Sequence, residues 1–286
     1  MKRELKGCIL INAFSRAESL ASSLESIVLA NIATDVPIFV VFQTGSTEVE
    51  AVLFCFREKI AEIIQVDGTG KSALENINSN RITGYTHLFD KLRMDWVLAI
   101  EEDVLIARDT LNFVEFIMNK YWNVRAFKGI NLGSREPLQT SLLDTYSKLR
   151  FGLNGQASAV TSKTWKGFNL RRITRKIAQN GFDSMIENNL RRGFMITPNL
   201  SRSLDIGWDG THQSSNPEDP YFVEMRESFV SGVLRTDAVY REININHRWR
   251  EDIEIYRRYR TLESILRRMK LQLKHKIKLL LVSKVN

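Results

Sequence analysis

The sequence predicts an α/β protein built on a mixed, mostly parallel β-sheet with helices packed on its faces. Through the first half of the chain, short apolar runs typical of strands alternate with helical patterns, which is the arrangement of βαβ units. The length of 286 residues and a hydrophobic fraction of 43% allow one large domain of this class. We expect this domain at residues 1–245 and a separate basic helical tail at residues 246–286.

Four strands are predicted in the first half, where the apolar runs are short. They are Cys8–Asn12, Ile38–Phe42, Ile63–Val66 and Trp96–Ile100. The segments between them carry the spacing of apolar residues by three and four that favours helices. The predicted helices are Glu18–Asn31, with Ser15 as its N-cap, Glu48–Ile60 and Arg81–Leu92, and Asp67–Asn80 is expected to be a polar loop.

The second half is less regular, and its elements are predicted from shorter signals. Asp109 is a suitable N-cap for an amphipathic helix that ends near Trp122. Two strands and a short third are expected at Phe127–Leu132, Gln156–Thr161 and Met195–Thr197, a helix at Phe182–Arg192 and a mobile loop at Gly207–Pro220. A long loop beside a binding crevice is commonly a lid.

Three consecutive carboxylates, Glu101, Glu102 and Asp103, follow the fourth predicted strand. Ionised groups this close repel one another unless a cation or strong donors compensate them, and a divalent metal is one such compensation. The alternative is a solvated turn before the next helix. In open α/β sheets, ligands bind outside the carboxyl ends of the strands, where Arg16 and Gln43 are also expected. This convergence favours the functional interpretation.

The positive net charge of +8 is concentrated near the C-terminus. Between Arg257 and Lys284 there are ten Lys or Arg and one acid, with apolar residues recurring by three and four. Such a basic amphipathic helix suits the surface of an anionic membrane. Packing on its own domain, pairing in a homo-oligomer, and nucleic-acid binding are the alternatives, of which nucleic acid is the least favoured.

Localisation is expected to be cytoplasmic, at the inner face of the plasma membrane. The N-terminus lacks the apolar centre of a signal peptide, and no run of about 18 apolar residues is present. Cys8 and Cys55 have neither metal-ligand nor redox spacing, which is typical of reduced packing residues.

Five segments in order resemble inverting, nucleotide-sugar-dependent glycosyltransferases of the GT-A fold, most closely the N-acetylglucosaminyltransferase I type. The resemblance covers about residues 7 to 230, and its segments are Ile9–Arg16, Val40–Gly45, Ile100–Asp109, Gly181–Met185 and Pro198–Ser203 with the loop after it. The first two imply that Asn12, Arg16 and Gln43 bind the donor. Thr44 stands where the family has an Asp that contacts uracil.

The resemblance also implies roles for later residues. Asp103 would be the direct ligand of Mn²⁺ or Mg²⁺, and Glu102 would support the sugar and diphosphate. Asp183 would be the catalytic base that deprotonates the acceptor hydroxyl, although an Asp before a helix can also be only an N-cap. Arg202 and His212 would bind the donor, with a structural role at the base of the loop as the alternative for Arg202.

The function expected on this basis is metal-dependent transfer of a sugar, with inversion, from a nucleotide diphosphate to a hydroxyl of a glycan. A UDP-sugar is the favoured donor, a hexose or N-acetylhexosamine the favoured group, and a lipid-linked or cell-surface polysaccharide the favoured acceptor. Two alternatives remain open: a nucleotidyltransferase with a related sheet, and a non-enzymatic protein that binds nucleic acid or membrane through its tail.

Overall fold

The structure, a computed structural model, describes residues 4–67, 73–134, 145–149, 156–167, 193–207, 229 and 240–242. The chain divides into one unit of Met1–Ile243 and a second of Asn244–Asn286. No residue of the second unit is among those described, so the predicted tail stays a prediction. The predicted helix at Phe182–Arg192 and most of the predicted loop at Gly207–Pro220 also lie outside the described residues.

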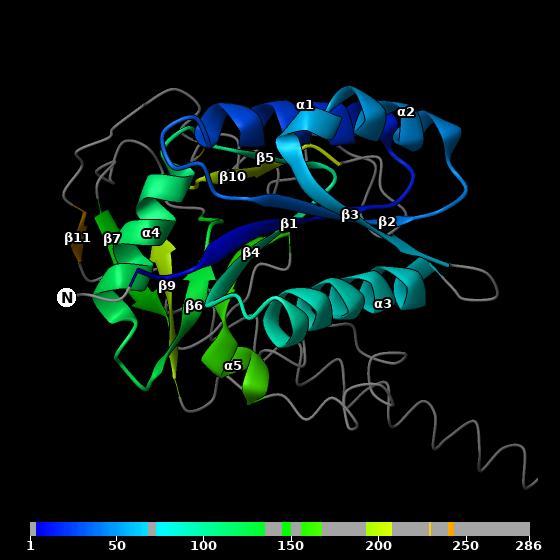
Figure 1. Ribbon diagram of the computed structural model, residues 1–286. Coiled ribbons are helices and arrows are strands. Elements are labelled where there is room, and N and C mark those ends of the chain that lie inside the picture. Colours follow the sequence, from blue (N-terminus) through cyan, green and yellow to red (C-terminus); the bar gives the residue numbers. More distant parts are fainter. Residues whose placement is uncertain are drawn as a thin grey trace, which may run out of the picture. The chain divides into compact units, whose positions relative to one another are not determined.

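A nine-stranded sheet forms the centre of the described part of the chain (Figure 1), in the order β11-β7-β9-β6-β8-β4-β1-β2-β3. Its strands are β1 (Gly7–Ala13), β2 (Ile38–Gln43), β3 (Ile60–Val66), β4 (Trp96–Glu101), β6 (Phe127–Asn131), β7 (Thr145–Leu149), β8 (Ala157–Thr161), β9 (Phe194–Pro198) and β11 (Arg241–Glu242). Strands β3, β2, β1 and β4 are parallel, and β8 is antiparallel to both β4 and β6. The predicted class, a mixed and mostly parallel sheet flanked by helices, is confirmed.

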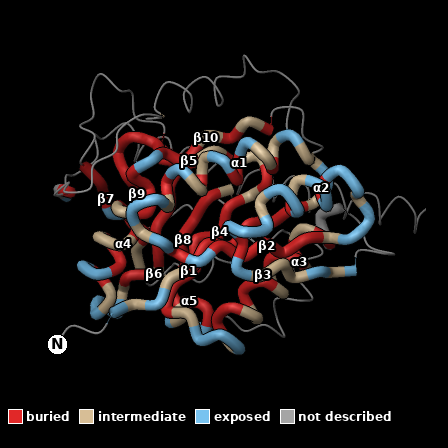
Figure 2. Tube along the Cα trace, turned by 45° about the horizontal axis from the view of Figure 1, so that its top comes forward, coloured by how far each residue is buried: buried red, intermediate tan, exposed pale blue. Residues whose placement is uncertain are grey.

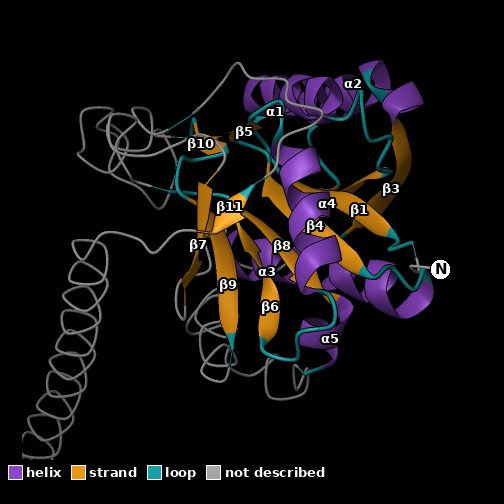
Figure 3. Cartoon of the chain, turned by 90° about the vertical axis from the view of Figure 1, so that its left-hand side faces the viewer, coloured by secondary structure: helices purple, strands orange, loops and turns teal. Residues whose placement is uncertain are grey.

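Helices cover both faces of this sheet (Figures 1 and 3). Helices α1 (Ala17–Ala30), α2 (Thr47–Cys55) and α4 (Thr110–Tyr121) pack on one face. Helix α3 (Ala73–Tyr85), its π-helical continuation (Thr86–Lys91) and α5 (Ser162–Lys166) pack on the other, and a short 3₁₀-helix (Arg57–Lys59) precedes β3. A separate two-stranded sheet pairs β5 (Val104–Ile106) with β10 (Ser203–Asp205) beside α1.

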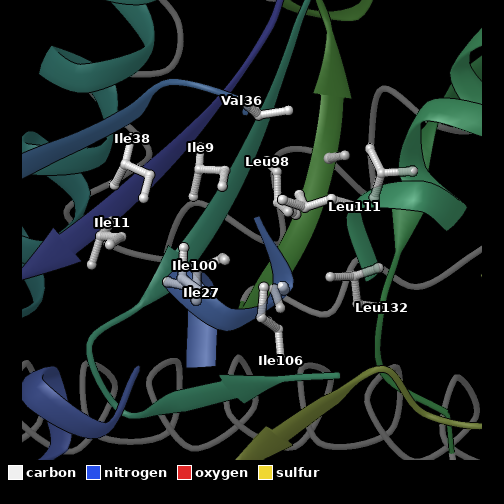
Figure 4. Packing of buried hydrophobic residues seen from close by; sticks show 14 of the residues in the cluster. Ile9, Ile11, Ile27, Val36, Ile38, Leu98, Ile100, Ile106, Leu111 and Leu132 are labelled. Atoms are coloured by element: carbon white, nitrogen blue, oxygen red, sulfur yellow. The ribbon is translucent and has the colours of Figure 1, made fainter. Parts of the chain in front are cut away.

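The central strands β1, β2 and β4 are apolar on both sides because each side meets a helix layer. Ile9 and Ile11 of β1 join the cluster under α1, α2 and α4, part of which Figure 4 shows. Cys8 and Leu10, which alternate with them, join the cluster under α3 and α5. Side chains of a strand point to opposite faces in turn, so a sheet buried on both faces reads as a continuous apolar run. Figure 2 shows β1, β2 and β4 as buried along most of their length.

Helix α3 begins eight residues earlier than predicted, at Ala73 instead of Arg81. The polar segment containing Asn76, Asn78 and Asn80 was expected to be a loop, but it is helical and these three side chains are buried. Asparagine disfavours helix only weakly, and tertiary packing overrides such preferences. Gly84 permits this packing, since a Cβ there would lie 2.7 Å from Leu10 Cδ2.

Several predicted ends and caps are also corrected. Helix α2 ends at Cys55 because the chain must turn before β3, which starts at Ile60. Ser15 does not cap α1, whose N-cap position is held by Arg16 without a side-chain hydrogen bond. Asp109 holds the N-cap position of α4 but makes no capping bond, since its carboxylate binds Arg202. Strands β5, β7, β10 and β11 and helix α5 were not predicted.

Within the described ranges, no helix has both the length and the apolar character needed to cross a membrane.

Candidate functional site

Parallel strands β1, β2 and β4 end at one edge of the sheet and bring the predicted donor-binding and metal-binding residues together. Asn12 of β1 is in register with Glu101 of β4, and the next residue, Ala13, is in register with Phe42 of β2. Gln43 closes β2, and Glu102 and Asp103 follow β4 directly. The sheet register therefore places Asn12, Gln43 and the acidic triplet at the same edge.

Glu102 holds the loop between β1 and α1. Its carboxylate accepts hydrogen bonds from the backbone N–H groups of Phe14, at 2.6 Å, and Ser15, at 3.3 Å. Burial raises the pKa of Glu102, and the bonds from the backbone of Phe14, Ser15 and Arg16 act in the opposite direction. The residue predicted to contact the sugar and diphosphate thus fixes the loop that carries Arg16.

Asp103 forms an ion pair with Arg16, through Oδ2 and Nη1. The carboxylate is 17% exposed and the guanidinium side chain 27% exposed. Burial and the charges of Glu101, Asp205 and Glu102 together raise the pKa of Asp103 to about 7, although the charge of Arg16 acts in the opposite direction. Among the described residues, Asp103 therefore lies near three other carboxylates and one cation, the guanidinium of Arg16.

Asp205 is a fourth acid at this edge, and no local pattern in the chain indicates its position there. Antiparallel pairing of β10 with β5 sets Asp205 opposite Val104, next to Asp103. Its carboxylate accepts hydrogen bonds from Gln156 Nε2 and, at 2.8 Å, from the N–H of Gly207. Because residues 103 and 205 are about a hundred positions apart, only the strand pairing reveals their proximity.

Gly207 packs directly against the Arg16–Asp103 pair. The N–H of Ile206 donates to the carbonyl oxygen of Asp103 at 2.8 Å, which fixes this segment to the strand end. A Cβ at position 207 would overlap Asp103 Oδ2 and lie 2.6 Å from Arg16 Nη1. The absence of a side chain is thus what allows the segment to pass over the ion pair.

On the α3 side of the same edge, buried amides lack partners. Asn12 is 8% exposed, and neither its Nδ2 nor its Oδ1 has a hydrogen-bond partner among the described residues. The same holds for Oε1 of Gln43. By strand alternation, both side chains share the α3 face with Glu101. An unsatisfied buried amide costs about 1–3 kcal/mol, so these groups are suited to hydrogen-bond a ligand.

Arg81 was missed by the sequence analysis, which placed it at the start of a helix without a role. It lies within α3 with its side chain 4% exposed, and its Nη2 is 2.7 Å from Glu101 Oε1. Glu101, the acid expected to matter least, therefore pairs with a buried cation beside Asn12.

Arg202 has the contacts of a structural residue. Its guanidinium, 3% exposed, is 2.9 Å from Asp109 Oδ2, and Tyr240 donates from its hydroxyl to the same oxygen at 3.2 Å. The ring of Phe113 lies 4.6 Å from Arg202 Cζ. These contacts are those of the structural alternative for Arg202, and its role in donor binding stays a prediction. Asp183 and His212 lie outside the described residues, and their roles stay predictions.

The carboxylates at the strand ends are suitable ligands for a hard divalent cation, because Mn²⁺ and Mg²⁺ prefer carboxylate oxygen. Asp103 is the suited ligand, since Glu102 is occupied by backbone amides and Glu101 by Arg81. Over the described ranges no group of three or more His, Cys, Asp or Glu residues is arranged to hold a metal.

No family model matches the sequence, and no curated protein matches it. Among solved structures, the chain is similar to residues 1–349 of TarS from S. aureus, with 8% identity and a TM-score of 0.49. It is also similar to the mannosyltransferase PcManGT from Pyrobaculum calidifontis, solved with GDP-Man and Mn²⁺, with 14% identity and a TM-score of 0.45.

A complex of TarS 1–349 with UDP-GlcNAc aligns with 12% identity and a TM-score of 0.46. The matches cover 71%, 69% and 76% of this chain, respectively. They cover 61%, 55% and 64% of the other chains, so this chain spans less than two thirds of each. The likeness concerns the arrangement of helices and strands.

Proposed function

We propose that this protein is a metal-dependent glycosyltransferase that moves a sugar from a nucleotide diphosphate to a hydroxyl of a glycan. The observation that carries the proposal is the edge where β1, β2 and β4 end. There, Arg16 and Asp103 lie in the segments that follow β1 and β4, and the amide of Asn12 at the end of β1 has no hydrogen-bond partner among the described residues. Ligands of open α/β sheets bind at this edge.

The two sides of this edge suit the two parts of such a donor. The neutral amides of Asn12 and Gln43, beside the Arg81–Glu101 pair, suit the hydroxyl and amide groups of a nucleoside. Arg16 suits the diphosphate, because a guanidinium binds phosphate oxygens through two parallel hydrogen bonds. A UDP-sugar is the donor we favour, in keeping with the resemblance to the N-acetylglucosaminyltransferase I type.

Departure of the diphosphate needs positive charge at its oxygens. A cation held by Asp103 supplies such charge as a Lewis acid. Arg16 adds a donor on the same side, and Glu102 keeps Arg16 in place through the loop backbone. Asp183 is the proposed base for the acceptor hydroxyl, which predicts inversion at the anomeric carbon by a single displacement.

The acceptor is proposed from the tail. Ten basic residues between Arg257 and Lys284 suit an anionic membrane surface. An enzyme held there would extend a lipid-linked or surface glycan such as polysaccharide or lipopolysaccharide. We therefore propose a peripheral position at the inner face of the plasma membrane.

A panel of nucleotide sugars tests the donor proposal by thermal stabilisation, since a ligand that binds the native state raises the unfolding temperature. We expect stabilisation by one nucleotide sugar in the presence of Mn²⁺, and little without it. Asp103→Asn should remove the Mn²⁺-dependent part of this thermal stabilisation. Arg125→Gln, at an exposed position after α4, should retain it. No response to any nucleotide sugar, together with no transfer or hydrolysis, would overturn the proposal.

The assignment of Asp183 needs a separate experiment. Asp183→Asn should bind the donor and Mn²⁺ as the unmodified chain does, while transfer to the acceptor falls by about a hundredfold or more. The anomeric configuration of the product, read by NMR, should be opposite to that of the donor. Retention of configuration, or full activity of Asp183→Asn, would contradict this role.

A further inference from the structure

We infer that Arg16 is an internal counter-ion of Asp103 that a divalent cation must displace, so that cation and diphosphate bind together. The inference deepens the proposed function and rests on it only for the identity of the diphosphate ligand. The competition between Arg16 and a cation for Asp103 rests on the contacts of this chain alone.

The four acids of the strand ends differ in how firmly their partners are held. Glu102 binds backbone amides, and Asp205 binds the backbone of Gly207 and the side chain of Gln156. Glu101 pairs with Arg81, whose side chain is 4% exposed. Asp103 is paired with the guanidinium of Arg16, which is 27% exposed and stands at the start of α1. Arg16 is therefore the partner that can move without breaking the fold.

Arg16 occupies the cation-binding side of Asp103. Its Nη1 contacts Oδ2, and Gly207 closes the other approach to the same oxygen. A divalent cation at the second oxygen of this carboxylate would still lie within a few ångströms of the guanidinium. At such separations two positive charges repel each other in a partly buried site, so the two cations compete.

A diphosphate removes this competition because it offers Arg16 another anionic partner. Arginine binds phosphate oxygens in a bidentate manner, and the same diphosphate supplies the oxygen ligands that the described side chains lack. Each ligand then favours the other, and the coupling is reciprocal by thermodynamic linkage. Arg16 would weaken the binding of metal alone and strengthen the binding of metal with diphosphate.

Titration of the full-length chain with Mn²⁺ alone, followed by the EPR signal of free Mn²⁺, tests this inference without any nucleotide sugar. Arg16→Gln should bind Mn²⁺ alone at least about fivefold more tightly than the unmodified chain. Arg125→Gln removes the same charge from an exposed position after α4 and should leave the affinity unchanged. Arg16→Lys keeps the charge and should resemble the unmodified chain.

The second half of the experiment adds inorganic pyrophosphate. In the unmodified chain, pyrophosphate should tighten Mn²⁺ binding, and in Arg16→Gln this gain should shrink by about fivefold. The double variant Arg16→Gln with Asp103→Asn should lose the increase in Mn²⁺ affinity, which locates it at Asp103. Unfolding temperatures show whether each variant is folded.

Unchanged or weaker Mn²⁺ binding by folded Arg16→Gln would overturn the inference, because Arg16 would then only order its loop. An equal affinity for pyrophosphate with and without Mn²⁺ would also overturn the inference, since Arg16 would then bind the phosphates without help from the metal. If Mn²⁺ affinity rises in Arg16→Gln while no nucleotide sugar binds, the counter-ion role stands and the proposed function fails.

Discussion

At the scale of single residues, neighbouring carboxylates of one short segment have separate functions. Glu102 is turned toward the loop between β1 and α1, where it accepts two backbone hydrogen bonds. Asp103 is turned toward Arg16 and Gly207. The resemblance ranked Asp103 as the metal ligand and Glu102 as a second contact, and the geometry assigns Glu102 a task of its own, which is to hold the loop.

Glu102→Ala should therefore destabilise the protein. The N–H groups of Phe14 and Ser15 would lose their acceptor, and a hydrogen bond to a charged group contributes about 1.5–3 kcal/mol. Urea unfolding followed by far-ultraviolet circular dichroism measures the loss. Glu102→Gln keeps one acceptor oxygen, and its urea midpoint should lie between those of Glu102→Ala and the unmodified chain. Equal midpoints for Glu102→Ala and the unmodified chain would show that the loop does not depend on this side chain.

The two cysteines should differ strongly in reactivity. Cys8 is 0% exposed, and burial raises the pKa of its thiol, whereas Cys55 is exposed at the end of α2. A thiolate is the reactive form, so a maleimide should label Cys55 within minutes and Cys8 only on unfolding. Mass spectrometry after labelling, with Cys55→Ser as the control, reads out each site. Rapid labelling of Cys55→Ser in the native state would contradict the buried position of β1.

At the scale of elements, three separate segments meet at Asp109. The carboxylate of this residue, at the start of α4, binds Arg202 before β10 and the hydroxyl of Tyr240 before β11. The ring of Tyr240 also packs edge-on against Phe113, with 5.0 Å between centroids. This cluster fixes β10, and with it Asp205, relative to the helix layer.

Removing different parts of this cluster should have graded effects. Tyr240→Phe keeps the ring packing and loses one hydrogen bond, which should cost about 1 kcal/mol. Arg202→Met leaves the Asp109 carboxylate buried without its cation and should cost about 3–5 kcal/mol. Urea denaturation measures both values. A larger loss for Tyr240→Phe than for Arg202→Met would show that the ion pair is not the main contact.

Two helix carboxylates should shift stability with pH in opposite directions. Burial, and the charge of Glu4, raise the pKa of Glu115 in α4. Its ionised form is disfavoured in the folded state, so stability is lost as pH rises through the folded pKa. Glu115→Gln should therefore have a higher unfolding temperature than the unmodified chain at pH 7 and an equal one below pH 4.5, the ordinary pKa of this group.

Glu48 provides the matched control. Its own backbone N–H and the hydroxyls of Ser46 and Thr47 lower its pKa, so it stabilises the fold above the ordinary pKa and this effect is lost at lower pH. Glu48→Gln should lower the unfolding temperature at pH 7 and leave it unchanged in acid. Shifts of the same sign in both variants would point to net charge instead of local environment.

At the scale of the whole molecule, the sheet and its two helix layers form one unit, and the basic tail is a proposed membrane contact. A chain truncated after residue 245 should lose binding to vesicles that contain anionic lipid, because each basic residue near such a surface contributes about 1 kcal/mol. Co-sedimentation with anionic and neutral vesicles measures this. Unchanged vesicle binding, or loss of nucleic-acid binding instead, would contradict the membrane role.

The sequence by itself determined the class of fold and the edge where the site lies. Apolar runs such as Cys8–Asn12 and Trp96–Ile100 can be recognised as strands in the sequence because both faces of these strands are buried. Their parallel direction then places Arg16 and Asp103 at a common edge, and the structure brings these residues together. This inference needed only patterns that are local in the chain.

Only the tertiary structure decided what contacts each of these residues. Asp205 lies next to Asp103 because β10 pairs with β5. Arg81 forms an ion pair with Glu101 from α3, a helix whose start was predicted too late because of its asparagines. Arg202 forms an ion pair with Asp109. Such contacts join residues 20 to about 100 positions apart, and no local pattern records them. Their energies depend on burial and on the neighbouring charges, which exist only once the chain has folded.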